Sequence, residues 1–193
     1  VINSGIITLK SSYSAKTTSN RGTFSLEDGA VFLSEGDGFE NSGTIRSNSA
    51  VTVSGDLTNG GNIKTPELVL ASTGKLISSA DLNLSALTAE KGSKVEITQS
   101  SLSVSTLNSK GASITVENGL LNAGDLNANG GSITVEENGS IKANDLQAQG
   151  VTYTQHGKNG ISAQNGWFTA STLNLLAGSI NASDIGGTLG NNT

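Results

Sequence analysis

Side chains that could carry out chemistry are few in this sequence, and they are scattered. Its 193 residues include one histidine, His156, two arginines, Arg21 and Arg46, and no cysteine. A thiolate nucleophile, a disulfide and a zinc-finger site are therefore excluded. The segment from Glu35 to Glu40 is acidic and glycine-rich, and Ca²⁺ would accept oxygens of this kind, but the spacing of a calcium loop is missing. We expect a solvated corner loop here, with a cation site as the alternative.

A second acidic pattern recurs at a fixed interval. Asp125, Asp145, Asn165 and Asp184 occupy equivalent positions in successive repeats of the chain. Carboxylates stacked about 4.8 Å apart would repel each other. We therefore expect each to hold its own corner through an Asx hydrogen bond. A cation shared by Asp125 and Asp145 is the alternative.

No set of residues forms a recognisable catalytic group. His156 stands between two expected strands with no second histidine and no paired carboxylate near it in sequence, so an exposed corner residue is expected. No acid and base pair suited to proton transfer is evident. The sequence thus predicts a protein that is not an enzyme, with no metal and no cofactor.

Composition narrows the class of protein further. Hydrophobic residues make up 34% of the chain and charged residues 14%, with a net charge of −5. A nucleic-acid binder would show a basic stripe, and a membrane helix would need a run of about 18 apolar residues. Neither feature is present. The chain contains no Met, and we expect that an upstream segment has been removed.

Internal repetition determines the expected fold. Leucines at 68, 87, 107, 126 and 146 begin similar blocks, as does Gly166, so the spacing is 19 or 20 residues. Towards the N-terminus the pattern loosens, with block starts near Phe24 and Ile45 and an incomplete block around Ile6 to Leu9. Such a period is typical of a solenoid, in which each repeat buries its apolar face only against the next one.

Each block contains three short stretches in which apolar and polar residues alternate. In one block these are Leu126 to Ala128, Ile133 to Val135 and Ile141 to Ala143. Alternation of period two indicates strands, and Gly, Asn and Asp between them indicate turns. Stacked blocks would align the apolar residues in three ladders: Leu68, Leu87, Leu107, Leu126 and Leu146; Val116, Val135, Gln155 and Leu175 beside Ile114, Ile133, Tyr153 and Leu173; and Leu82, Leu102, Leu121, Ile141, Ile161 and Ile180.

The expected fold is therefore an all-β, single-stranded parallel β-helix of about nine turns. We expect the right-handed form, because the turns exceed the ~18 residues of a hexapeptide-based left-handed coil and because parallel crossovers are right-handed. It would be a single domain over residues 1–193, with irregular turns over 1–67, regular turns over 68–184 and a tail over 185–193.

Trp167 is the only tryptophan of the chain. When Gly166 is aligned with Leu126 and Leu146, Trp167 matches Asn127 and Gln147, which point outward, whereas Phe168 points inward. An exposed indole can stack on a sugar or fill a partner's pocket. Trp167, with Gln147 beside it, is therefore the candidate contact site; cover by a loop or by the tail is the alternative.

Residues 39–74 resemble the repeat region of filamentous haemagglutinin-type proteins. The matching residues are Asn41 to Ile45, Val51 to Val53 and Gly55 to Asn59, and the rhythm is also similar to autotransporter passenger domains. These are exoproteins of Gram-negative bacteria, so the resemblance implies a right-handed β-helix at the outer surface, often an adhesin. The Asn-Pro-Asn motifs of the secretion domain are absent, and Pro66 is the only proline.

These observations predict a secreted or cell-surface rod that acts in attachment. Its partners would be surface glycans or proteins, or copies of itself, rather than nucleic acid, and it would not span a membrane. One alternative is a filament subunit, because an open β-helix end invites another chain to add on. The other is a polysaccharide-degrading enzyme or a tailspike-like depolymerase.

Overall fold

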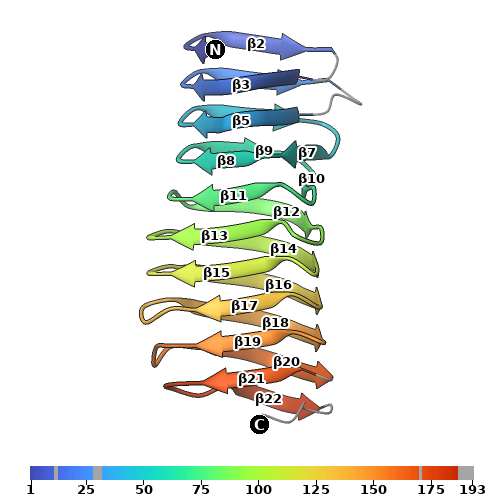
Figure 1. Ribbon diagram of the computed structural model, residues 1–193, viewed down its shortest axis with the longest axis vertical. Coiled ribbons are helices and arrows are strands. Elements are labelled where there is room, and N and C mark those ends of the chain that lie inside the picture. The colour runs from blue at the N-terminus through green and yellow to red at the C-terminus, as the bar shows by residue number, and fades with distance from the viewer. Residues whose placement is uncertain (11–12, 28–31, 170, 187–193) are drawn as a thin grey trace.

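The structure is a computed structural model that describes residues 1–10, 13–27, 32–169 and 171–186. For 14–16, 32–37 and 183–186 it describes the backbone alone. The described residues form strands and turns only, as the alternation predicts. The strands stack in parallel as a solenoid of about nine turns, which confirms the expected fold class (Figure 1).

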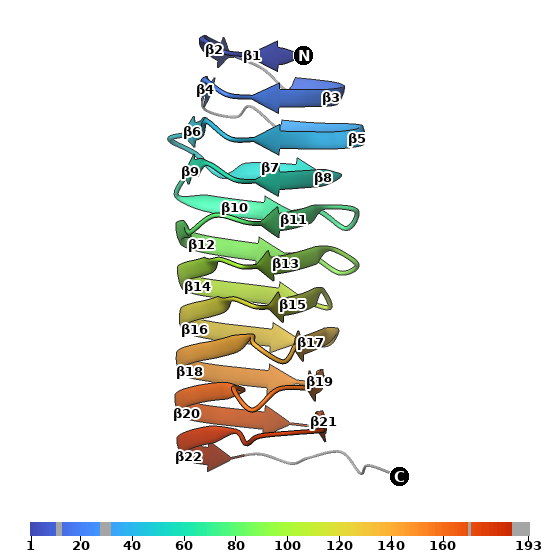
Figure 2. The same ribbon diagram turned by 90° about the vertical axis from the view of Figure 1, so that its left-hand side faces the viewer.

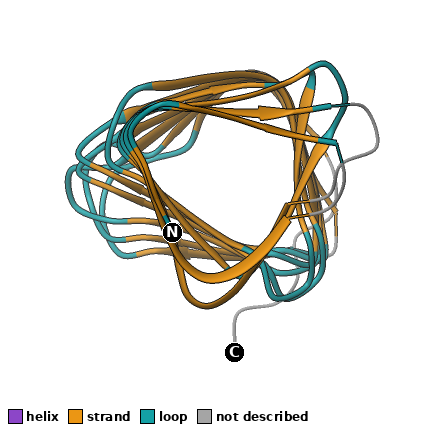
Figure 3. Cartoon of the chain, turned by 90° about the horizontal axis from the view of Figure 1, so that it is seen from above, coloured by secondary structure: helices purple, strands orange, loops and turns teal. Residues whose placement is uncertain are grey.

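Each turn has three sides, which are visible when the coil is viewed along its axis (Figure 3). The side that we call face 1 runs from the N-terminal end to the C-terminal end of the coil. Its strands are β1 (Ile2–Asn3), the second halves of β3 (Tyr13–Asn20) and β5 (Phe32–Asn41), β8 (Asp56–Asn59), β11 (Lys75–Ser78), β13 (Lys94–Thr98), β15 (Ser113–Glu117), β17 (Ser132–Val135), β19 (Thr152–Gln155) and β21 (Thr172–Leu175).

The other two sides of each turn are called face 2 and face 3. In the C-terminal turns one long strand, bent at a corner, supplies both: its first half lies on face 2 and its second half on face 3. Face 2 begins with β2 (Ile6–Leu9), β4 (Thr23–Leu26), β6 (Thr44–Ser47) and β9 (Asn62–Lys64), and face 3 contains β7 (Val51–Ser54) and β10 (Glu67–Leu70). The long strands are β12 (Leu82–Ala89), β14 (Ser101–Lys110), β16 (Leu120–Asn129), β18 (Ser140–Gln149), β20 (Ile161–Thr169) and β22 (Asn181–Gly186).

The chain winds as a right-handed coil, with each turn directly beneath the one before (Figure 2). Leu107 pairs with Leu126, and Leu126 pairs with Leu146, so the register follows the expected block spacing. These three leucines are at most 1% exposed. The ladders over Ile114 and Val116 on face 1, and over Leu82 and Leu102 on face 2, are confirmed in register and burial as far as Tyr153, Gln155 and Ile161. In the last turn Leu173 and Ile180 are only partly buried, and Leu175 is 44% exposed.

The block starts proposed near Phe24 and Ile45 are wrong as predecessors of Leu68. Phe24 and Ile45 pair with each other on face 2, whereas the partner of Leu68 in the preceding turn is Val51 on face 3. The early turns carry aromatic and polar side chains in their interior. A repeat alignment based on apolar residues alone therefore placed Phe24 and Ile45 on the wrong side of the coil. The Tyr13 and Phe24 rings and the Phe24 and Phe39 rings meet edge to face, with centroids 4.9 and 5.5 Å apart.

A buried ladder of asparagines fills one corner of these N-terminal turns. Asn3, Asn20, Asn41 and Asn59 are all at most 4% exposed. The amide nitrogens of Asn3, Asn20 and Asn41 each donate to the amide oxygen of the next asparagine, at 2.8, 2.8 and 2.7 Å. Each of the four also donates to a backbone carbonyl, that of Thr23, Thr44, Asn62 or Gly61. The corner is therefore polar inside, but its amide nitrogens are satisfied.

Candidate functional site

Trp167 lies on the outside of face 3, as the register predicts. It pairs with Gln147, which in turn pairs with Asn127, and its side chain is 50% exposed. The prediction that it points outward is confirmed, and no loop of the described residues covers it fully. Residues 187–193 of the expected tail lie outside those described. Phe168 points into the coil and is buried.

The interior beneath Trp167 is rearranged to hold Phe168. Gly166 stands where the preceding turn has Leu146, and Phe168 stands where it has Ala148. From one turn to the next, the leucine side chain at the first position is lost, and the methyl group of alanine two residues later is replaced by a phenyl ring. This compensation keeps the interior filled. It also anchors the strand that presents Trp167.

A shallow groove with a volume of about 650 Å³ runs across β14, β16, β18 and β20, next to Trp167. Two columns of outward side chains border it, and the inward-pointing residues between them leave the strand backbone as its floor. The first column is Asn108, Asn127, Gln147 and Trp167; the second is Lys110, Asn129, Gln149 and Thr169.

Amide groups dominate the groove, and several of them have no partner. The Asn127 amide donates to the Asn108 amide oxygen at 3.1 Å. Within the described part of the chain, the side chains of Asn129, Gln147 and Gln149 make no hydrogen bond. These three are exposed, so water satisfies them, and a ligand that replaces this water must offer both donors and acceptors.

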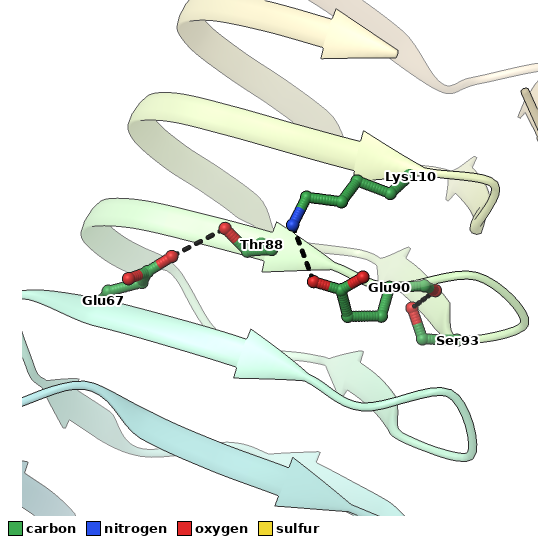
Figure 4. A network of polar contacts seen from close by, with 5 residues as sticks. All are labelled: Glu67, Thr88, Glu90, Ser93 and Lys110. Atoms are coloured by element: carbon green, nitrogen blue, oxygen red, sulfur yellow. Dashed lines mark hydrogen bonds and ion pairs between the residues drawn. The ribbon is translucent and has the colours of Figure 1, made fainter. Parts of the chain in front are cut away.

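The groove carries one cation, and that cation is paired. Lys110 Nζ lies 2.8 Å from the Glu90 carboxylate, which belongs to the preceding turn (Figure 4). The same edge of face 3 holds a second contact, in which the Thr88 hydroxyl donates to the Glu67 carboxylate at 2.6 Å. The side chains that line the groove therefore bring no unpaired charge to it.

The column of Asp125, Asp145 and Asn165 lies at the start of face 3, and the register aligns it as the sequence predicts. The Asn165 amide donates to the Asp145 carboxylate at 2.7 Å, a bond between turns in place of the expected Asx bond within one corner. Asp184 pairs with Asn165, but its side chain is outside those described.

The residues from Glu35 to Glu40 do not form the expected corner loop. They belong to β5, where the pairing with β3 shifts between Ala15 and Thr17. The side chains of Glu35 and Asp37 lie outside those described. Among the described residues, no three His, Cys, Asp or Glu side chains come together in a way that could hold a metal ion.

His156 is exposed at the corner between β19 and β20, as expected. Beside it, Tyr153 and Gln155 are buried and linked: the Tyr153 hydroxyl donates to the Gln155 amide oxygen at 2.8 Å. The Gln155 amide nitrogen donates to the carbonyls of Gly157 and Ala177. Burial raises the pKa of Tyr153 well above its usual range, so the phenol stays neutral and donates this hydrogen bond.

Sequence reasoning missed Lys110, Asn129 and Gln149 as parts of the site. The signal was available, because these residues follow Asn108, Asn127 and Gln147 by two positions and so point to the same side. It also missed the asparagine ladder. An Asn-x-Gly motif recurs there, beginning at residues 3, 20, 41 and 59.

Comparison of the chain with protein-family models, with curated proteins and with solved structures finds no match in any of the three. Over the residues that the structure describes, no helix has the length and apolar character needed to cross a membrane. The fold and the groove are therefore the basis for assigning a function.

Proposed function

We propose that this chain is a structural and adhesive rod of the bacterial outer surface, and that it attaches through the groove beside Trp167. The single observation that supports this most strongly is the half-exposed indole at the end of a polar groove on an otherwise regular coil. Tryptophan is over-represented among residues that dominate binding energy. The resemblance to filamentous haemagglutinin-type repeats supports an exported protein of a Gram-negative bacterium.

The rigidity of the coil suits attachment. Consecutive turns pair along all three sides, so the groove residues come from four strands that cannot shift independently of one another. A site held by regular strands loses little conformational freedom on binding. The rod would hold this face away from its base and bind through several modest polar contacts.

Adhesion of coated microspheres tests this proposal. Beads that display the chain through one end are expected to be retained under flow on cell monolayers and on polysaccharide-coated surfaces, more than uncoated beads. Trp167→Ala should reduce retention, whereas Asn122→Ala, an exposed asparagine of β16 outside the groove, should not. Equal retention of coated and uncoated beads on every surface would refute an adhesive role.

Apolar side chains that are exposed in the first and last described turns favour a second function, that of a filament subunit. Ile2 and Ile6 are 77% and 76% exposed in the first turn, and Leu176 is 69% exposed in the last. Strands β1 and β21 lie on the same face, so a second copy could continue the parallel pairing end to end. Sedimentation velocity should show association that Leu176→Asp weakens; a strict monomer at high concentration would count against it.

We also propose that the chain is not a catalyst and needs neither metal nor cofactor. The paired Lys110 and the exposed His156 lie on different faces, so they form no acid and base pair. Calorimetric titration with Ca²⁺ is expected to give no binding isotherm. A panel of glycans incubated with the chain should remain uncleaved, and release of reducing ends would instead support the depolymerase alternative.

A further inference from the structure

We propose that the groove binds a linear, uncharged polysaccharide whose chain lies along the axis of the coil. This inference rests on the proposed adhesive function and names the chemical class of its ligand. It follows from three properties of the groove: the balance of its charges, the spacing of its amides and the setting of Trp167.

The charge balance favours a neutral ligand. Lys110 is paired with Glu90, and the other side chains of the two columns end in amides, a hydroxyl and an indole. A sulfated or uronic-acid polymer would bring a row of anions to a face with no free cation to receive them. Such a ligand would lose hydration without gaining an ion pair.

The amides fit a ligand with hydroxyl groups. Asn129, Gln147 and Gln149 each offer a carbonyl oxygen and an NH₂ group, and sugar hydroxyls both donate and accept. Successive rows lie about 4.8 Å apart. One pyranose unit adds a similar length to an extended polysaccharide, so a chain parallel to the axis would meet one row of amides per sugar.

Trp167 supplies the apolar contact that such a ligand needs. Its neighbour in the following turn is Gly186, which has no side chain, and its neighbour in the preceding turn is the flexible Gln147. Among the described residues, space thus remains beside the half-exposed indole, where the C–H face of a sugar ring could stack. Ligand sites commonly combine one aromatic surface with a few polar groups in this way.

Other polymers fit the groove less well. A peptide that adds a strand needs a free sheet edge, whereas β16 and β18 are paired on both sides. A nucleic acid needs a basic stripe, but the groove has only the paired Lys110. The uncharged glycan is therefore the occupant that the groove chemistry favours.

Binding can be followed by the fluorescence of Trp167, because it is the only tryptophan of the chain. Soluble oligosaccharides from cellulose and from mannan are the neutral probes, and polygalacturonate is the charged one. We expect at least one neutral probe to shift the emission to the blue and to protect it from iodide. Added salt should leave the affinity unchanged, because no ion pair forms.

Variants measured by calorimetry locate the site. Trp167→Ala should weaken binding about tenfold or more, and Asn129→Ala about two- to tenfold. Asn122→Ala is the matched control, since it removes an exposed asparagine from the same strand, β16, outside the groove. Binding that all three variants keep would overturn the assignment to this groove.

The outcomes separate this inference from the proposed function. If no neutral probe changes the emission or gives heat while coated beads still adhere, the glycan inference fails and the adhesive role stands. Tighter binding of polygalacturonate, or adhesion that protease treatment of the target surface abolishes, would also overturn the inference. If neither probes nor surfaces are bound, both proposals fail.

Discussion

Removal of Asn41 from the buried asparagine ladder should destabilise the N-terminal turns strongly. Its amide oxygen accepts from Asn20 at 2.8 Å, and its amide nitrogen donates to Asn59 at 2.7 Å and to the carbonyl of Asn62 at 3.2 Å. In Asn41→Ala, Asn20 loses an acceptor and the Asn59 oxygen loses its donor. Both groups remain buried, where water cannot replace the missing partner.

The size of the loss follows from these two groups. A buried polar group without its partner costs about 1–3 kcal/mol, so the unfolding free energy should fall by roughly 2–6 kcal/mol. Asn122→Ala, which truncates an exposed asparagine in β16, should change it by less than about 0.5 kcal/mol. Urea unfolding followed by far-ultraviolet circular dichroism compares the two variants.

Asn41→Asp should make the same corner sensitive to pH. An ionised carboxylate could accept from Asn20, but it would place a charge against the oxygen of Asn59. A protonated carboxyl group could donate to that oxygen, so folding raises the pKa of the introduced group above the value of about 3.9 in the unfolded chain. This variant should be most stable at acid pH and lose stability as the pH rises through the folded-state pKa.

Two results would refute this reasoning. One is Asn41→Ala unfolding within about 0.5 kcal/mol of the unmodified chain, which would show that the ladder contributes no net stability. The other is Asn41→Asp with the same pH dependence as the unmodified chain. Either result would mean that water reaches this corner and replaces the ladder bonds.

Three further predictions concern the core, a close approach and the exposed indole. Leu126→Asp should lower the unfolding free energy by roughly 4 kcal/mol or more, because an unpaired charge would enter the leucine ladder, whereas Asn122→Asp should leave it nearly unchanged. Similar melting temperatures for the two variants would contradict the register. Gly160→Ala should lower the unfolding free energy by about 1–3 kcal/mol, because the new Cβ would collide with the buried Gln155 amide, whereas the Cβ of Gly60→Ala would make only ordinary contacts. Equal stability of the two variants would show that Gln155 can move aside. Trp167 emission should be quenched by iodide in the free protein, and an unquenched, blue-shifted emission would show that the ring is covered.

The regular turns could be predicted from the sequence because each interior position there repeats the same kind of residue. Leu107, Leu126 and Leu146 reveal the turn length directly, and that length fixes which neighbours point outward. The outward position of Trp167 therefore followed from counting along the strand. The groove did not, because it depends on side chains from four turns and on the pairing of Lys110 with Glu90.

The N-terminal turns could not be predicted in the same way, because their interior breaks the usual association of polar with exposed. Asn20, Asn41 and Asn59 are buried although asparagine normally indicates a turn at the surface. Each of these asparagines is buried because an asparagine of a neighbouring turn supplies a hydrogen-bond partner for its amide. This pairing joins residues 17 to 21 positions apart, and single-residue patterns do not report it.

The separation of about one turn between pairing partners also determines how this chain can acquire its structure. Each strand pairs with one that was completed one turn earlier, so a segment needs only its predecessor as a template. Structure in such arrays grows by adding neighbouring units to an existing nucleus. A chain that emerges from a ribosome or a secretion pore can therefore fold progressively, because each completed turn offers the strands on which the next segment pairs.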